Sequence, residues 1–403
     1  MSDPALDDRD LNGRDLNDRD VNDRDLNDRD LNDSGTFAVV TGGGTSGHVL
    51  PALAIADALV AAGHPPAAVH YVGTQRGVET RLLPPTPYPH TFLDVVGLQR
   101  SVSRRNLAVL PKLLRADRAA KRLLRELRPK VVVNVGGYGS FPATWAARRL
   151  GVPYVVVSYD RRPGLVSRLL APRATVCAVA FPGSRLPHAE LVGSPVRQEL
   201  IHLDRASARA AAREALDLPE DRFVVAVMCG SQGAAAVNTV VAQLVELAAG
   251  RRDLAVHHVV GDRFLADAAP ARDGSTGILY RVIGYEDRMP QLYAAADLFV
   301  TRGGAGTIAE LSTVGVPAIV VPWPGAAENH QVDNAQVLSE QQAAILLEQH
   351  DLHATDLLAR IDAFIADPAS LAAMAERAHE AGVLHRSGKL VQVIERVAMG
   401  GSA

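Results

Sequence analysis

Residues 297–334, DLFVTRGGAGTIAELSTVGVPAIVVPWPGAAENHQVDN, contain two short apolar runs on either side of a glycine-rich turn and a helix-like segment. The runs 298–300 and 318–321 are typical of buried strands, and 307–314 between them is typical of a helix. This order predicts one strand–turn–helix–strand unit of a parallel sheet. Ligands of such sheets bind beyond the carboxyl ends of the strands, where helix N-termini offer unpaired N–H groups to anions.

Polar residues stand where this unit would meet a ligand. Glu310 lies in the helix, and Gln331 and Asn334 follow the second strand. A carboxylate is a poor ligand for phosphate but a good hydrogen-bond acceptor for the hydroxyl groups of a sugar or a ribose. The pattern therefore favours a hydroxyl-bearing ligand, and an ordinary solvated helix is the alternative.

Length and composition indicate a globular protein of two domains. The chain has 403 residues, of which 47% are apolar and 22% charged, so it is long enough for two hydrophobic cores. No apolar run approaches the roughly 18 residues that span a bilayer, and the N-terminus has no signal-peptide pattern. Cys177 and Cys229 are the only cysteines, which excludes a disulfide framework, fits a reducing cytosol and argues against a structural zinc site.

The net charge of −3 is unevenly distributed along the chain. Residues 1–34 hold twelve Asp and five Arg, a balance of −7, so the rest of the chain carries +4. Segment 98–130 holds eleven Lys or Arg against Asp117 and Glu126, with Leu or Val at near-helical intervals. Such a segment predicts binding to an anionic membrane surface, which attracts each nearby Lys or Arg by about 1 kcal/mol. A solvated helix that packs its leucines inward is the alternative, and nucleic acid is a weaker candidate because no aromatic residues interleave the charges.

Residues 8–32 repeat a five-residue unit, DRDLN, with Gly13 and Val21 as variants. A period of five matches neither a helix nor a strand, and the unit is polar and self-repelling. We therefore predict a disordered tail that takes no part in the fold. A calcium-binding role for its aspartates is disfavoured, because the spacing lacks the glycines of the known calcium repeat.

The folded part begins with a strand over 37–41, the loop GGGTSGH (42–48), and a helix predicted over 51–62 with Pro51 near its start. Gly42, Gly44 and Gly47 match the dinucleotide pattern G-x-G-x-x-G, but a lone match is weak evidence. A nicotinamide site needs an acidic residue at the end of the second strand, and the strand over 69–72 ends in Gly73-Thr74. The sequence therefore argues against a nicotinamide cofactor.

The pattern of strand, glycine loop and helix restarts after GSPVR (193–197). A strand over 223–228 leads into a second glycine turn, CGSQGA (229–234), and further strands are predicted over 255–260, 280–283, 298–300 and 318–321. Two such halves predict two doubly wound α/β domains that face a cleft. We expect the tail over 1–34, one domain over 35–197, a second over 198–372, and C-terminal helices over 373–403 that return towards the first domain.

Six motifs resemble, in order, the signature blocks of the MurG-type N-acetylglucosaminyltransferases: GGGTSGHVLPALAIADAL, VGGYGSFP, GSPVR, GSQGA, RGGAGTIAEL and HQVDNA. The resemblance covers nearly all of 36–395 and implies a GT-B fold. It implies inverting transfer of GlcNAc from UDP-GlcNAc to the 4-hydroxyl of the muramyl sugar of undecaprenyl-pyrophosphoryl-MurNAc-pentapeptide, a step of peptidoglycan synthesis. It also implies a peripheral enzyme on the cytoplasmic face of the cell membrane, with no essential metal or cofactor. Proteins of cell-wall synthesis or division are further candidate partners.

The resemblance also assigns a donor site. Without a metal, backbone dipoles must stabilise the charge that develops on UDP as the sugar–diphosphate bond breaks. Ser231, Gln232 and Gly233 at a helix N-terminus are suitable donors, and a merely rigid turn is the alternative. The resemblance places Thr307 and the backbone of Ala305 and Gly306 at the diphosphate, Glu310 at the ribose, Tyr285 and Glu286 at the uracil, Arg197 at the nucleotide, and His330, Gln331 and Asn334 at the GlcNAc.

The acceptor hydroxyl needs a proton acceptor whose pKa lies near neutrality. His48, in the first glycine loop, is the candidate base, and a structural histidine that caps the loop is the alternative. The acceptor diphosphate is expected to bind Thr45, Ser46, Gly47, Gly136, Gly137 and Tyr138.

One segment departs from the family's pattern. After the strand over 154–157 the family carries His-Glu-Gln-Asn, whose asparagine faces the donor sugar, whereas this chain reads SYDRRPG (158–164), one residue shorter. Asp160 is expected to substitute there as a polar or basic group, and Ser46 replaces a glycine. Three alternatives therefore stay open: a GT-B transferase with another acceptor, the similarly folded UDP-GlcNAc 2-epimerase, and a catalytically weak nucleotide-sugar-binding paralogue that acts as a scaffold. The epimerase needs cleft carboxylates that Glu310 alone does not supply.

Overall fold

The computed structural model describes residues 35–95, 104–230 and 232–401, and residues 36–403 belong to one compact unit. The repeat tail that we predict to be disordered lies outside the described residues, as do residues 96–103 of the basic segment and Ser231. Among the described residues, no helix is long and apolar enough to cross a membrane.

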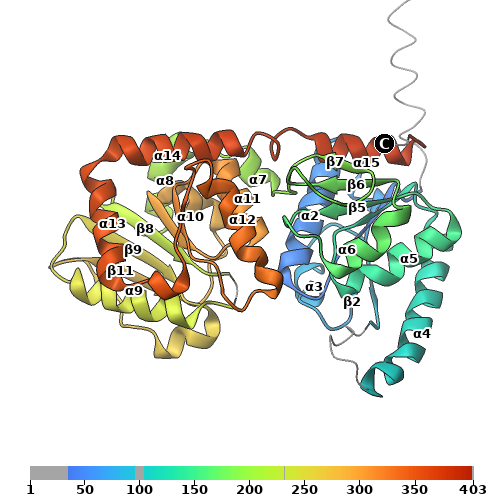
Figure 1. Cartoon of the computed structure of the whole chain (residues 1–403), viewed down its shortest axis with the longest axis horizontal. Coiled ribbons are helices and arrows are strands. Elements are labelled where there is room, and N and C mark those ends of the chain that lie inside the picture. Colours follow the sequence, from blue (N-terminus) through green and yellow to red (C-terminus); the bar gives the residue numbers. More distant parts are fainter. Residues whose placement is uncertain (1–34, 96–103, 231, 402–403) are drawn as a thin grey trace, which may run out of the picture. The chain divides into compact units, whose positions relative to one another are not determined.

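The first sheet consists of parallel strands in the order β3-β2-β1-β4-β5-β6-β7. Strands β2 and β3 lie on one side of β1 and β4 lies on the other, so the winding direction changes between β1 and β4. Crevices open at such switch points beyond the carboxyl ends of the strands. The elements, labelled in Figure 1, are β1 (Ala38–Thr41), α2 (Ser46–Ala61), β2 (Val69–Thr74), α3 (Glu79–Leu82), β3 (His90–Leu93), α4 (Arg104–Leu127), β4 (Val131–Asn134), α5 (Phe141–Leu150), β5 (Tyr154–Ser158), α6 (Leu165–Leu170), β6 (Val176–Val179) and β7 (Ala189–Leu191).

The second sheet repeats this plan in the order β10-β11-β9-β8-β12-β13-β14, with only the β10–β11 pair antiparallel. Its switch point lies between β8 and β12. Its elements are α7 (Gln198–Ile201), α8 (Arg205–Ala215), β8 (Phe223–Met228), α9 (Ala235–Leu247), β9 (Leu254–Val259), β10 (Arg272–Asp273), β11 (Leu279–Ile283), α10 (Met289–Ala295), β12 (Leu298–Thr301), α11 (Ala305–Val314), β13 (Ala318–Val320), α12 (His330–Ser339), β14 (Ile345–Leu346), α13 (Ala354–Ala366) and α14 (Pro368–Ala381).

Both sheets are buried on both faces, which explains why their strands read as continuous apolar runs. In β1, Ala38 and Val40 point to the face that α2 covers, whereas Val39 points to the face that α4 and α5 cover. In the second sheet, α8, α10 and α11 pack on one face, and α9 and α13 pack on the other. The predicted class, two doubly wound parallel sheets, is therefore confirmed.

The last helix, α15 (Lys389–Ala398), packs against the first sheet although it follows the second sheet in sequence (Figure 1). Its residues Leu390, Val393, Ile394 and Val397 join the apolar cluster under α2, and it contacts β4, β5 and β6. The chain thus crosses between the two sheets twice, once before α7 and once after α14.

The described part of the basic segment forms α4, which presents an apolar face to the first sheet. Ala116, Ala120 and Leu124 are buried in the cluster that contains Leu93 and Val95. The inward packing that we gave as the alternative interpretation is therefore present, and it leaves the opposite, basic face of the helix exposed.

One helix boundary in our sequence analysis was wrong. The helix after the first glycine loop begins at Ser46, not at Pro51, so Pro51 lies inside it. A proline has no N–H group to donate to the carbonyl four residues earlier, here that of Gly47. Tyr159, directly after β5, supplies the missing donor, because its hydroxyl donates to the Gly47 carbonyl at 2.6 Å.

Candidate functional site

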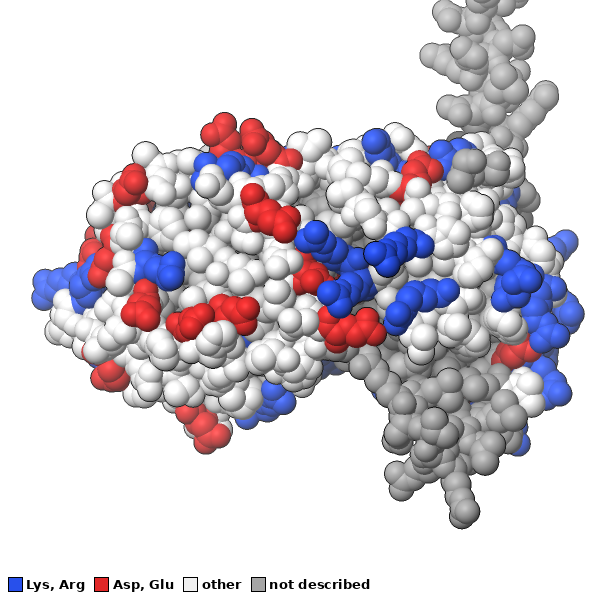
Figure 2. All heavy atoms as spheres, in the orientation of Figure 1, with Lys and Arg blue, Asp and Glu red and all other residues white. Residues whose placement is uncertain are grey.

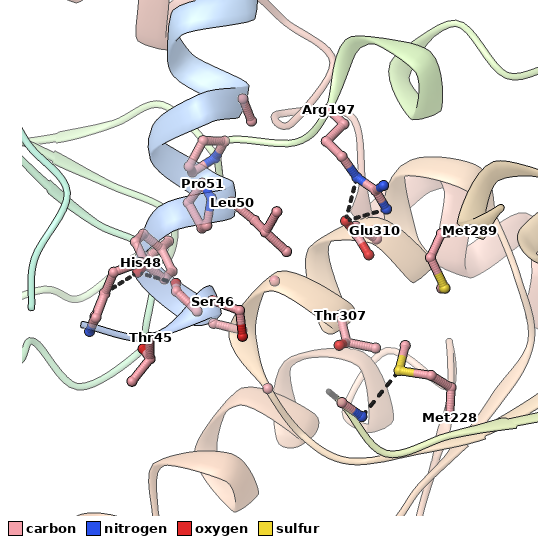
Figure 3. Close-up of a pocket in the computed structure, with 18 of the residues that line it drawn as sticks. Thr45, Ser46, His48, Leu50, Pro51, Arg197, Met228, Met289, Thr307 and Glu310 are labelled. Carbon is pink, nitrogen blue, oxygen red and sulfur yellow. Dashed lines mark hydrogen bonds and ion pairs between the residues drawn. The ribbon is translucent and has the colours of Figure 1, made fainter. Parts of the chain in front are cut away.

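Two cavities meet at the carboxyl ends of the two sheets. The larger, of about 470 Å³, is lined by both halves of the chain (Figure 3), and the smaller, of about 220 Å³, by loops of the first sheet. His48, Tyr159 and Asp160 line both cavities. The larger cavity brings together most of the residues that the sequence nominated, namely Thr45, Ser46, Gly47, His48, Asp160, Arg197, Tyr285, Glu286, Ala305, Gly306, Thr307, Glu310 and His330.

The smaller cavity contains the nominated turn Gly136–Tyr138. Gly136 and Gly137 have φ angles of 93° and 76°, a region that favours glycine. A Cβ atom on Gly137 would lie 2.2 Å from the Gly43 carbonyl oxygen and 2.8 Å from the His48 ring, so this position also requires glycine for space. The buried Asn134 holds the turn, because its side-chain oxygen accepts from the Gly136 N–H at 3.1 Å.

A carboxylate that the sequence analysis missed holds the first glycine loop. Glu79, fully buried in α3, accepts hydrogen bonds from the Gly44 N–H at 3.2 Å and from the Thr74 N–H and hydroxyl at 2.9 and 2.8 Å. The nicotinamide pattern requires a carboxylate at the end of the second strand, whereas Glu79 lies five residues beyond Thr74, the last residue of that strand. Its oxygens are used by the loop itself, so it gives no support to a nicotinamide site.

His48 lies at the N-terminal end of α2, half-buried between the two cavities. Its Nδ1 lies 2.5 Å from the hydroxyl of Tyr159. Burial lowers the pKa of His48 below its usual value, although the negative charge of Asp160 and the Val135 carbonyl act in the opposite direction. The imidazole is therefore neutral at pH 7 and able to accept a proton, as a general base must be.

The N-terminus of α11 opens into the larger cavity. The helix begins at Ala305 with Gly304 as its N-cap, and no side chain of the described residues caps it. The first N–H groups of a helix have no partner within the helix and carry a partial positive charge, so they suit an anion. Thr307 lies in this first turn and borders the cavity (Figure 3).

Glu310, one turn further along α11, is fixed by two neighbours. Its Oε1 accepts from Nε and Nη2 of Arg197 at 3.2 and 3.1 Å (Figure 3), and its Oε2 accepts from the hydroxyl of Tyr293 at 2.8 Å. The Arg197 guanidinium also pairs with Glu199 at 3.1 Å. A carboxylate oxygen accepts more than one hydrogen bond, so the oriented Glu310 keeps capacity for hydroxyl groups of a ligand.

The side chain of Glu286 is held by hydrogen bonds within the protein. It accepts from His257 at 3.0 Å and from the Arg288 N–H and Nε at 2.9 and 3.1 Å. Although burial raises its pKa, these donors outweigh burial and lower the pKa to about 2. Because the carboxylate is held in this way, the segment of Tyr285 and Glu286 offers the cavity mainly its backbone, which suits the uracil position that the resemblance assigned.

The structure does not place Asn334 and Gln331 on the wall of either cavity. Asn334 is fully buried, its amide donates to Asp160 at 3.1 Å and to the Gly303 carbonyl at 3.2 Å, and it accepts from the Arg161 N–H at 3.1 Å. The side-chain carbonyl of Gln331 accepts from the Trp323 N–H at 2.9 Å. Asn334 thus joins the variant segment 158–164 to α12 instead of facing open space.

Of the described residues of the second glycine turn, only Gly230 borders the cavity. A Cβ atom on Gly233 would lie 1.9 Å from the Val260 carbonyl oxygen, so the glycine allows the turn to pack against the end of β9. The Gly233 N–H already donates to the Gly230 carbonyl at 3.0 Å. Gln232 is exposed, and Ser231 lies outside the described residues.

Sequence reasoning missed an apolar part of the larger cavity. Leu50 and Pro51 from α2 face Met228 and Met289 from the second sheet (Figure 3). Met228 ends β8 directly before the second glycine turn, so the rule that ligands bind at the carboxyl ends of strands predicts its position. No rule of this kind predicts that Leu50, within α2, borders the cavity.

The arrangement suits a transfer between two ligands, an anionic one at α11 and an acceptor near the first sheet, with His48 between them. Family models agree with this class: the glycosyltransferase family 28 N-terminal domain matches residues 38–179, and the family 28 C-terminal domain matches residues 224–388.

Proteins of similar sequence indicate which family 28 glycosyltransferases this chain resembles. The chain is 37% identical over 360 residues to a UDP-N-acetylglucosamine--N-acetylmuramyl-(pentapeptide) pyrophosphoryl-undecaprenol N-acetylglucosamine transferase of Clavibacter sepedonicus, a match that covers 89% of this chain and 96% of the relative. It is 27% identical to crystalline MurG of Acinetobacter baumannii, with a TM-score of 0.67 over 89% of this chain and 99% of that chain. This chain belongs to the MurG family of these transferases.

The UDP-GlcNAc 2-epimerase of Neisseria meningitidis has a TM-score of 0.61 over 89% of this chain and 99% of its own, but only 12% identity. That likeness concerns the fold alone.

Proposed function

We propose that this protein transfers GlcNAc from UDP-GlcNAc to the 4-hydroxyl of the muramyl sugar in undecaprenyl-pyrophosphoryl-MurNAc-pentapeptide, with inversion, to form the lipid-linked disaccharide of peptidoglycan synthesis. Membership of the MurG family supports this function. The observation that carries the mechanism is the position of His48 where the donor-side and acceptor-side cavities meet.

On the donor side, the N-terminus of α11 and the hydroxyl of Thr307 hold the UDP diphosphate. Their partial positive charge stabilises the negative charge that develops on UDP as it leaves. Glu310 accepts hydrogen bonds from the ribose hydroxyls while Arg197 and Tyr293 hold its carboxylate in place. The uracil binds the backbone at Tyr285 and Glu286.

On the acceptor side, the glycine turn of Gly136 and Gly137 and the loop of Thr45 to Gly47 hold the lipid diphosphate. The muramyl hydroxyl attacks C1 of GlcNAc from the side opposite UDP. The new C1–O bond forms as the C1–O bond to UDP breaks, UDP leaves with the electron pair, and the hydroxyl proton passes to His48. This in-line displacement accounts for inversion.

The GlcNAc lies between His330 and the segment that contains Asp160. Asn334 supports this segment through its bonds to Asp160 and Arg161, so we assign it a supporting position and not direct sugar binding. The side-chain carbonyl of Gln331 accepts from the Trp323 N–H, and Gln331 borders neither cavity, so we assign it a supporting position as well.

The test is transfer of labelled GlcNAc from UDP-GlcNAc to the lipid-linked muramyl-pentapeptide, with and without EDTA. Product formation that resists EDTA supports the proposal and the absence of an essential metal. UDP-GlcNAc binding without product contradicts it and favours the alternatives that the variant segment 158–164 left open, namely another acceptor or a nucleotide-sugar-binding scaffold.

Replacement of Glu310 by glutamine is expected to raise the KM for UDP-GlcNAc about 10- to 100-fold, because hydrogen bonds to a charged acceptor contribute about 1.5–3 kcal/mol. Steady-state kinetics with varied UDP-GlcNAc measures this change. Glu199→Gln is the matched control, because Glu199 pairs with the same Arg197 but is 55% exposed and does not line the cavity. Equal KM values for the two variants would argue against ribose binding by Glu310.

We further propose that α4 docks on the cytoplasmic face of the membrane, where the lipid-linked acceptor is held. The exposed Arg115, Arg118, Arg122 and Arg125 follow one stripe of the helix, opposite the face of Ala116, Ala120 and Leu124. In Figure 2, Lys and Arg gather at the edge of the molecule where Figure 1 shows α4 and α5.

Reversing the charge of Arg118, Arg122 and Arg125 to glutamate is expected to weaken binding to anionic vesicles by about 100-fold or more, since each nearby basic residue contributes about 1 kcal/mol. Co-sedimentation with phosphatidylglycerol vesicles measures this binding. A control of equal net charge changes three exposed arginines elsewhere to glutamate, namely Arg173, Arg185 and Arg252. If both triple variants bind equally, the docking surface is not α4.

A further inference from the structure

Tyr159, in the segment that departs from the family's pattern, contacts His48 within the site. Its side chain is 6% exposed, and its hydroxyl lies between two partners, the Gly47 carbonyl at 2.6 Å and Nδ1 of His48 at 2.5 Å. The rings of Tyr159 and His48 meet edge to face, 6.1 Å apart. The sequence analysis assigned no function to Tyr159.

The protons of this contact can be counted. A phenol has one proton, and burial raises the pKa of Tyr159 well above its usual value, so the phenol keeps that proton. The Gly47 carbonyl only accepts, and Pro51 has no N–H to donate to it within α2. Both contacts are hydrogen bonds only if Tyr159 donates to Gly47 and Nδ1–H of His48 donates to Tyr159.

We propose that Tyr159 is a positioning residue that holds His48 in the tautomer with a proton on Nδ1 and a lone pair on Nε2. This inference rests on the proposed function, because Nε2 is then the atom that takes the proton of the acceptor hydroxyl. The step is balanced: the hydroxyl proton moves to Nε2, Nδ1 keeps its own proton, and His48 becomes an imidazolium until it releases the new proton.

A phenol fixes the ring without the electrostatic effect of a carboxylate. A carboxylate on Nδ1 would stabilise the imidazolium and raise the pKa of His48, whereas a neutral hydroxyl orients the ring and raises the pKa much less. The charge that acts on His48 comes instead from Asp160, the next residue. From the first sheet, Tyr138 also faces the smaller cavity. From the second sheet, the titratable groups on the larger cavity are Arg197, Tyr285, Glu286, Asp287, Glu310 and His330.

The direct test is nitrogen NMR of the full chain with ¹⁵N-labelled histidine, in which the His48 signals are identified by their loss in His48→Gln. The expected result at pH 7.5 is a protonated Nδ1 and an unprotonated Nε2. A proton on Nε2 overturns the proposal. This readout does not depend on turnover, so it separates failure of this inference from failure of the proposed transferase function.

The kinetic test is Tyr159→Phe, which removes only the hydroxyl group. We expect kcat to fall about 10-fold, with the KM of both substrates within about 2-fold, because the ring loses its orientation. The acidic limb of the pH profile is expected to move to lower pH, since the imidazolium loses a hydrogen-bond acceptor. Tyr154→Phe is the matched control, because it removes a buried hydroxyl from β5, the strand directly before Tyr159, and this hydroxyl bonds to the Leu170 carbonyl outside both cavities.

A double variant separates positioning from general destabilisation. In the His48→Ala background, Tyr159→Phe is expected to cause no further loss of kcat, because the base that Tyr159 orients is already absent. A further 10-fold loss in that background, or an unchanged pH profile of the single variant, overturns the proposal.

Discussion

Replacement of His48 by alanine is expected to lower kcat by about 10²- to 10⁴-fold, the usual contribution of a general base, with little change in either KM. Single-turnover transfer of labelled GlcNAc measures this loss at the chemical step. Because burial lowers the pKa of His48, the neutral base predominates above that pKa. Activity of the unchanged protein should therefore be retained at neutral pH and lost as the pH falls through the lowered pKa.

Two further variants make this prediction specific. His48→Gln keeps a polar side chain beside Tyr159 but takes up no proton near neutral pH, so it should lose as much activity as His48→Ala. The control His64→Ala removes a histidine that bonds to Glu395 and lies outside both cavities. Added imidazole should restore part of the rate of His48→Ala only. Wild-type turnover in His48→Ala would show that another group accepts the proton.

Much of the fold was predictable from the sequence because its signals are local. Apolar runs of four to six residues that end in glycine turns mark the central strands of both sheets, and β8 was predicted with its observed bounds. The short edge strands β7 and β14 were not predicted, because each has only two or three residues, too few to show a strand pattern. Whether such a short segment forms a strand depends on its packing against neighbouring strands, which the local sequence does not reveal.

The candidate site was predictable to the extent that it follows from strand ends. The loops after β1, β4, β8 and β12 meet the cavities because parallel strands present their carboxyl ends on one edge of each sheet. Side-chain direction was not predictable. The side chain of Asn334 bonds to Asp160 and Arg161, and that of Gln331 bonds to Trp323. These contacts depend on how α12 packs.

The contact between Tyr159 and His48 was predictable in part. Pro51 was visible in the sequence, and a proline inside a helix always leaves one carbonyl without its helix partner. Our placement of Pro51 at the start of the helix concealed this consequence. The identity of the donor, a tyrosine 112 residues from Gly47, followed only from the three-dimensional structure.

The second large effect is expected at a buried ion pair that joins the elements behind the donor site. Arg213 of α8 is 1% exposed, and its Nη2 donates to Asp297 at 2.7 Å while its other N–H groups donate to backbone carbonyls. Asp297 also accepts from the Val224 N–H at 2.7 Å. The pair thus fixes the starts of β8 and β12, the two strands whose opposite ends carry the glycine turns at the second switch point.

Asp297→Ala is expected to lower the free energy of unfolding of this half by about 3–5 kcal/mol, because it leaves Arg213 buried without a counter-charge. Arg205, whose pKa burial lowers to about 10, and Arg209 lie beside the same carboxylate, so their mutual repulsion adds to the loss. Urea unfolding followed by the fluorescence of Trp323, in a Trp145→Phe background, reports on the second sheet alone.

Asp253→Ala is the matched control for Asp297→Ala, because it removes the same carboxylate from an arginine pair. Asp253 bonds to Nε and Nη2 of Arg251, both at 2.7 Å, but the carboxylate is 50% exposed. Water replaces a lost partner at such a site, so the expected cost is at most about 1 kcal/mol. If Asp297→Ala is no more costly than Asp253→Ala, the Arg213 guanidinium is adequately solvated by its carbonyl partners, and the packing of α8 holds β8 and β12 without the carboxylate.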